Sequence, residues 1–138
     1  MRILVAVDGS KPSLKAVQLL IEHSDWYREK PEVELVTVHL PVPQVARLPK
    51  TQLERYYAEE GEAKLASSKK KLDAAGIRYH PHVLVGPVAE AIVRHAKDKR
   101  CELIYIGTRG MSELGKALLG STATKVIHIA DTPVLLVK

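Results

Sequence analysis

Short apolar runs alternate with amphipathic helical patterns along the whole chain. The apolar runs predict five strands, at residues 2–7, 33–40, 78–85, 103–106 and 133–137. The segments with apolar residues three or four positions apart predict four helices, at about residues 10–27, 51–75, 87–97 and 120–130. Strands and helices therefore alternate from the first predicted element to the last.

This alternation predicts an α/β fold, a doubly wound five-stranded parallel sheet with helices on both faces. Right-handed crossovers make the fold doubly wound, and the strand order that we expect is 3-2-1-4-5. In such sheets ligands bind at the carboxyl ends of the strands where the winding reverses. We therefore expect a site where the first and fourth strands end, at residues 8–10 and 107–110.

The length of the chain, 138 residues, fits one domain spanning residues 1–138. No apolar stretch is long enough to cross a bilayer, and the apolar run at residues 3–7 is too short for the core of a signal peptide. Cys101 is the only cysteine, so an intrachain disulfide is excluded. These features predict a cytoplasmic protein without a membrane partner.

The net charge is +5, from 21 basic and 16 acidic side chains, and such a balance can attract anions. The only basic run, residues 69–71, lies on a predicted helix that carries several glutamates upstream. A solvated helix face explains this run better than a nucleic-acid surface does.

A spaced glycine motif follows the fourth predicted strand. Gly107 and Gly110 are separated by two residues, and nine more residues lead to Gly120 and Ser121. Glycine lets the backbone approach an anion, and the amides at a helix start attract negative charge. The motif predicts a nucleotide phosphate site, whereas the alternative is that the glycines only form turns. The pattern is neither a Walker A loop nor a dinucleotide fingerprint.

Other candidate chemistry is sparse. His80 and His82 lie on the same side of a strand, but the sequence supplies no evident third metal ligand, and surface histidines are the simpler interpretation. No serine, histidine and aspartate pattern identifies a nucleophile, and no residue is identified as a general base for ATP hydrolysis. We therefore assign no catalytic residue and no protein metal site.

The whole chain resembles the universal stress protein family, in its small, single-domain, nucleotide-binding form. The glycine motif matches the family's ATP motif in full, and the opening residues 3–10 and closing residues 132–138 are also similar to the family. The resemblance implies an ATP-binding regulatory module of the stress response, whose conformation or choice of partner depends on the bound adenine nucleotide. The alternatives are a slow ATPase and a nucleotide-independent, chaperone-like dimer.

The resemblance also implies roles for individual residues. Asp8 would hold the ribose hydroxyls, although the same side chain could instead cap the first helix. Arg109 would meet a terminal phosphate, and Mg²⁺ or Mn²⁺ would bridge the phosphates. The full set expected at the nucleotide is Ala6, Val7, Asp8, Leu40, Ile106, Gly107, Arg109, Gly110, Gly120, Ser121 and Thr122.

The last predicted strand, residues 134–137, is apolar and lies at the edge of the expected sheet. An apolar edge strand is usually covered or paired. Pairing with a second copy across a twofold axis would cover it, and members of the resembled family commonly dimerise in this way. We therefore expect a homodimer through this strand.

Overall fold

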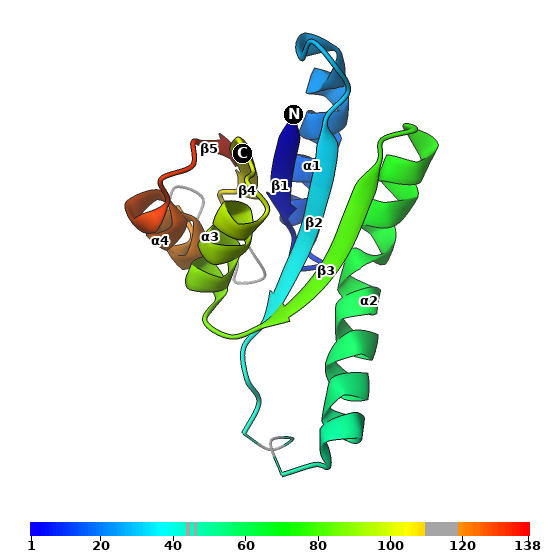
Figure 1. Cartoon of the computed structure of the whole chain (residues 1–138), viewed down its shortest axis with the longest axis vertical. Coiled ribbons are helices and arrows are strands. Elements are labelled where there is room, and N and C mark those ends of the chain that lie inside the picture. Colours follow the sequence, from blue (N-terminus) through cyan, green and yellow to red (C-terminus); the bar gives the residue numbers. More distant parts are fainter. Residues whose placement is uncertain (44, 46, 110–118) are drawn as a thin grey trace.

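The computed structural model describes residues 1–43, 45, 47–109 and 119–138 (Figure 1). The strands are β1 (Arg2–Ala6), β2 (Glu32–His39), β3 (Tyr79–Val85), β4 (Leu103–Gly107) and β5 (Val134–Val137). The α-helices are α1 (Lys11–His23), α2 (Lys50–Ala74), α3 (Val88–Asp98) and α4 (Ser121–Ile129).

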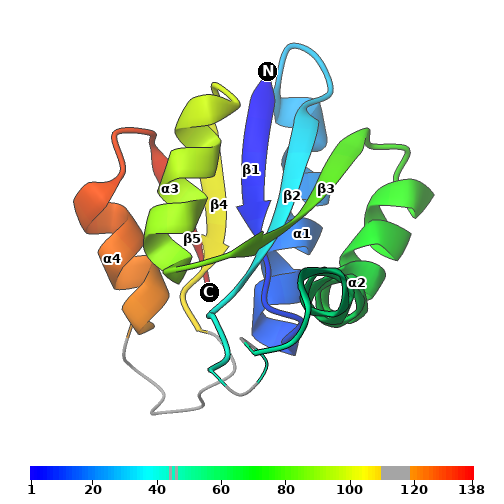
Figure 2. The same cartoon turned by 60° about the horizontal axis from the view of Figure 1, so that its bottom comes forward.

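The strands form one parallel sheet in the order β3-β2-β1-β4-β5. Figure 2 shows α1 and α2 on one face of the sheet and α3 and α4 on the other. The predicted α/β fold, strand order and two-sided helix cover are thus confirmed. The winding reverses between β1 and β4, which leaves the carboxyl ends of these two strands side by side.

Successive side chains of each strand point to opposite faces of the sheet, so the strands contribute to a hydrophobic core on each face. In β1, Ile3 and Val5 point to the α1 and α2 side, whereas Leu4 and Ala6 point to the α3 and α4 side. All four side chains are buried, because the strand lies in the middle of the sheet with helices on both faces.

Glycine ends the long helix α2. Gly76 has φ +66°, a left-handed conformation that glycine adopts without a steric cost. Its N–H donates to the Asp73 carbonyl, and the Ile77 N–H donates to the Leu72 carbonyl. This pair of bonds is a Schellman cap, and it turns the chain toward β3.

The first helix is shorter than its sequence pattern predicts. The pattern extends to about residue 27, but α1 ends at His23 and a 3₁₀ turn, Ser24–Trp26, follows. The Ser24 N–H donates to the Ile21 carbonyl, a tighter bond than the α-helical one. The apolar spacing alone does not distinguish this final 3₁₀ turn from a continued α-helix.

Candidate functional site

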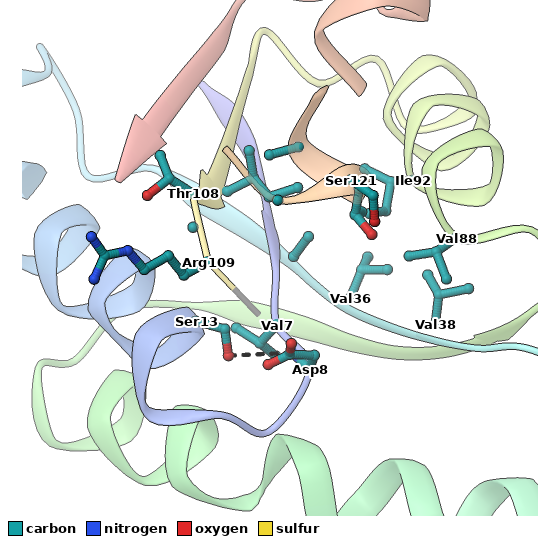
Figure 3. A pocket seen from close by; sticks show the side chains of 16 residues that line it. Val7, Asp8, Ser13, Val36, Val38, Val88, Ile92, Thr108, Arg109 and Ser121 are labelled. Atoms are coloured by element: carbon teal, nitrogen blue, oxygen red, sulfur yellow. Dashed lines mark hydrogen bonds between the residues drawn. The ribbon is translucent and has the colours of Figure 1, made fainter. Parts of the chain in front are cut away.

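A cavity of about 360 Å³ opens at the carboxyl ends of β1 and β4. This volume lies in the range of small-molecule sites. The cavity is bounded by strand ends, by the loops that follow β1 and β4, and by the first turns of α3 and α4 (Figure 3). Its lining residues are Ala6, Val7, Asp8, Ser13, Val36, Val38, Val88, Ile92, Ile106, Gly107, Thr108, Arg109, Gly120, Ser121, Thr122 and Ala123.

One wall of the cavity is apolar. Val36 and Val38 project from β2, and Val88 and Ile92 face them from α3 (Figure 3). Because β2 alternates, both valines lie on the α3 side of the sheet. The wall offers a flat aromatic group a surface without competing polar side chains.

The opposite part of the cavity is built from backbone and small polar side chains. The Gly120 N–H donates to the Thr108 carbonyl at 2.7 Å, which brings the two described parts of the glycine motif together. A Cβ on Gly107 would lie 3.3 Å from the Arg109 carbonyl oxygen and 3.4 Å from that of Pro12. Glycine therefore allows the end of β4 to approach the start of α1 closely.

The helix α4 presents its amino terminus to this part of the cavity. It begins at Ser121, its N-cap is Gly120, and within the described part of the chain no side chain caps it. Its first turn also carries no acidic residue. The amides and the positive dipole end at the start of a helix favour an anion at this position.

Asp8 has a structural role besides facing the cavity. Its Oδ1 accepts a hydrogen bond from the Ser10 N–H at 2.9 Å, and its own N–H donates to the Ser13 Oγ at 3.3 Å. Ser10, not Asp8, caps α1, because the Ser10 Oγ accepts from the Ser13 N–H. The carboxylate thus braces the turn after β1 through one oxygen.

The structure gathers most of the predicted site residues around the cavity. Leu40 is an exception, since it is 63% exposed and is absent from the lining. Gly110 lies outside the described residues. Arg109 lines the cavity through part of its chain, while its guanidinium extends away from Ser121 and the apolar wall (Figure 3). The predicted residues found in the lining are Ala6, Val7, Asp8, Ile106, Gly107, Arg109, Gly120, Ser121 and Thr122.

The apolar wall and the contribution of α1 through Ser13 were not predicted from the sequence. The signal for Val36 and Val38 was their position on alternate residues near the end of a central strand. Among the described lining residues, the charged side chains are one carboxylate, Asp8, and one guanidinium, Arg109. No histidine is among these lining residues.

His39 packs against α2 and is not part of the described lining. Its ring lies 3.3 Å from the Lys64 Nζ and beside the Tyr57 ring. Burial, and then the positive charge of Lys64, lowers the pKa of His39. The imidazole is therefore held neutral as a packing group.

The two histidines of β3 have different partners. The His80 Nε2 lies 2.5 Å from the Glu32 carboxylate at an exposed position. His82 instead joins Glu34 and His95 in a cluster beneath α3. The structure therefore does not complete the pair of His80 and His82 considered from the sequence. It instead brings His82 together with a carboxylate and a second histidine, because β2, β3 and α3 meet there.

Comparison with known proteins assigns the family. The model of the universal stress protein family matches residues 1–138. The universal stress protein MJ0531 of Methanocaldococcus jannaschii is 34% identical over 138 residues, which cover 99% of this chain and 81% of that protein. The chain belongs to the universal stress protein family.

Solved structures agree with this assignment. The structure of MJ0577, also from Methanocaldococcus jannaschii, matches with a TM-score of 0.84 at 29% identity, over 99% of this chain and 94% of that one. A universal stress protein from Archaeoglobus fulgidus, solved in complex with dAMP, matches with a TM-score of 0.70 at 26% identity, over 100% of this chain and 98% of that one.

None of the helices in the described ranges combines the length and the apolar character needed to cross a bilayer.

Proposed function

We propose that this chain binds an adenine nucleotide, ATP in the first place, and acts as a nucleotide-dependent regulatory module of the stress response. The observation that carries the proposal is that the cavity has two different parts. One part is the apolar wall that includes Val36 and Val38, and the other is the amino terminus of α4. A nucleotide has the same two parts, an aromatic base and an anionic phosphate chain.

In this proposal the base lies against Val36 and Val38, and the phosphates meet the backbone at Gly120 and Ser121. The family relative solved with dAMP supports the choice of an adenine nucleotide. The carboxylate of Asp8 would accept hydrogen bonds from ribose hydroxyls through the oxygen that does not brace Ser10.

A Mg²⁺ or Mn²⁺ ion would accompany the triphosphate. The described lining offers one carboxylate, Asp8, which is too little for an all-protein cation cage. The ion would therefore be held mainly by phosphate oxygens and water. Its chemical contribution would be to neutralise part of the phosphate charge.

The proposal also includes a homodimer through β5. This strand lies at the edge of the sheet, and Leu136 on it is exposed, as are Ile127 and Ile129 on the neighbouring α4. Apolar groups and unpaired backbone at a sheet edge favour pairing with another strand. A second copy of the same chain, related by a twofold axis, would cover the apolar groups and pair with the backbone of the edge strand.

The proposal is tested by calorimetric titration of the nucleotide-stripped protein with Mg-ATP, with GTP as the control. Saturable binding of about one ATP per chain, with weaker GTP binding, is expected for a single built site. A folded protein that binds neither nucleotide would contradict the proposal.

A further inference from the structure

A second polar cluster lies on the same face of the sheet as the cavity, toward the opposite ends of the strands. Glu34 of β2, His82 of β3 and His95 of α3 meet there. The Glu34 Oε2 lies 2.6 Å from the His82 Nε2 and 3.2 Å from the His95 Nε2. None of the three residues lines the cavity.

The fold explains why these residues meet. Glu34 lies two residues before Val36 and so on the same face of β2, and Val36 pairs in register with His82. His95 follows Ile92 by three residues, about one turn further along the same face of α3. The strand pair β2 and β3 and the helix α3 thus bring one carboxylate and two imidazoles close together.

The cluster is largely shielded from water. The Glu34 side chain is 3% exposed, that of His95 is 10% exposed and that of His82 is 25% exposed. A buried carboxylate is costly without compensating positive charge. Arg2 supplies part of this positive charge, since its Nε lies 3.7 Å from the Glu34 Oε1. This is the carboxylate oxygen that does not contact the imidazoles.

We propose that Glu34, His82 and His95 form a binding site for a divalent transition-metal ion, Zn²⁺ in the first place. Two imidazole nitrogens and one carboxylate oxygen are a donor set that Zn²⁺ prefers, and three protein ligands leave a fourth position for water. All three ligand atoms lie within 4.8 Å of one another. Arg2 would act as an outer partner that orients the carboxylate.

The distances require adjustment at His82, since its Nε2 has to come to the ligand spacing from both Glu34 and the His95 Nε2, and all three atoms lie within 4.8 Å of one another. Ligand atoms around a tetrahedral Zn²⁺ ion lie about 3.3 Å apart. The Glu34–His95 distance of 3.2 Å already matches, whereas the Glu34–His82 distance of 2.6 Å has to open. His82 is the most exposed ligand and lies on the edge strand β3, so it is the ligand that we expect to shift.

Protonation sets the condition for binding. Metal binding requires neutral imidazoles whose Nε2 atoms are free of protons. The two Nε2 atoms now hydrogen-bond to Glu34, so a bound ion would displace their protons. The ion would replace the hydrogen bonds that now join the two rings to Glu34.

Competition of the untagged protein with a chromogenic chelator for Zn²⁺ tests this site. The wild type should bind about one Zn²⁺ per chain. His82→Gln and His95→Gln should each weaken binding by at least about 100-fold, because losing a ligand costs more than losing a residue that only hydrogen-bonds to a ligand, and the latter costs up to about 100-fold. His80→Gln is the matched control on the same strand, and its affinity should equal that of the wild type. Circular dichroism checks that each variant is folded.

Bound Co²⁺ provides a second measurement. The wild type should give the intense visible absorption of a tetrahedral Co²⁺ site, and His82→Gln should lose it while His80→Gln keeps it. His82 is partly exposed, so this comparison remains decisive even if His95→Gln fails to fold. Equal Zn²⁺ affinity in the wild type and folded His82→Gln, or no Zn²⁺ binding by the wild type, would leave a purely hydrogen-bonded cluster and overturn the proposal.

Discussion

At the scale of single residues, Asp8 combines a structural and a proposed binding role. One of its oxygens accepts from the Ser10 N–H, so the side chain helps to form the turn at the cavity. An asparagine at this position retains an oxygen for that bond and loses only the charge. The two roles can therefore be separated by one substitution.

Asp8→Asn should lower the ATP affinity about tenfold, or about 1.4 kcal/mol, because a charged acceptor makes stronger hydrogen bonds to ribose hydroxyls than a neutral amide does. Its melting temperature should remain near that of the wild type. Ser10→Ala should do the reverse, since it removes the helix cap and costs about 1 kcal/mol of stability without touching the nucleotide. Calorimetry and thermal unfolding measure both, and an unchanged ATP affinity in Asp8→Asn would limit Asp8 to its structural role.

Residues with local chemical signals are the ones that the sequence predicts best. Gly120 and Ser121 are recognisable because glycine and a helix-starting serine have distinct backbone properties. Val36 of the cavity carries only the weaker signal of its position near a strand end, because its residue type does not distinguish a valine that lines a cavity from one buried in a core. His95 is likewise hidden, because its partners come from two other elements.

At the scale of elements, the contact between α2 and β3 depends on one small residue. Gly61 is buried in the middle of α2 and faces Val83 of β3. A Cβ at Gly61 would fall on the Val83 methyl groups and 2.9 Å from the Val83 Cβ. The helix can lie this close to the strand because position 61 has no side chain.

Gly61→Ala should therefore destabilise the protein by about 1–3 kcal/mol through overpacking, despite the better helix propensity of alanine. Ser67→Ala, at an exposed position of the same helix, should stay within about 0.5 kcal/mol of the wild type. Adding Val83→Ala to Gly61→Ala should restore part of the loss. Urea unfolding measures all of these, and a stabilised Gly61→Ala variant would refute this account of the contact.

The elements themselves were predictable, because hydrophobic periodicity differs between strands and helices. Their ends were less so: the 3₁₀ turn Ser24–Trp26 replaces the last predicted turn of α1. The boundary is set by the Ser24 N–H, which donates to the carbonyl three residues back and not four. Such a change in hydrogen bonding does not alter the spacing of apolar residues.

At the scale of the whole molecule, the doubly wound topology predicts both the place of the cavity and the exposed edge. The alternation of elements was sufficient to predict a parallel sheet with right-handed crossovers, and the observed order is one that such crossovers allow. It was insufficient for the Glu34, His82 and His95 cluster. That cluster depends on the register of β3 and on the rotation of α3, which the order of elements does not specify.

The edge strand provides a prediction about assembly. The wild type should elute as a dimer in size-exclusion chromatography with light scattering. Leu136→Lys should be monomeric, because a charge on β5 opposes pairing at that edge. Val85→Lys, an exposed site on the opposite edge strand β3, should remain dimeric. A monomeric wild type, or a dimeric Leu136→Lys, would show that β5 is not the interface.

The most direct test of the central claim is a Mg-ATP titration of the wild type beside two tryptophan variants. Val38→Trp places a large ring against the apolar wall of the cavity, and Val85→Trp places the same ring on an exposed part of β3. The account predicts that the wild type and Val85→Trp bind ATP equally and that folded Val38→Trp loses binding. Equal ATP binding by all three proteins would place the nucleotide elsewhere and contradict the account.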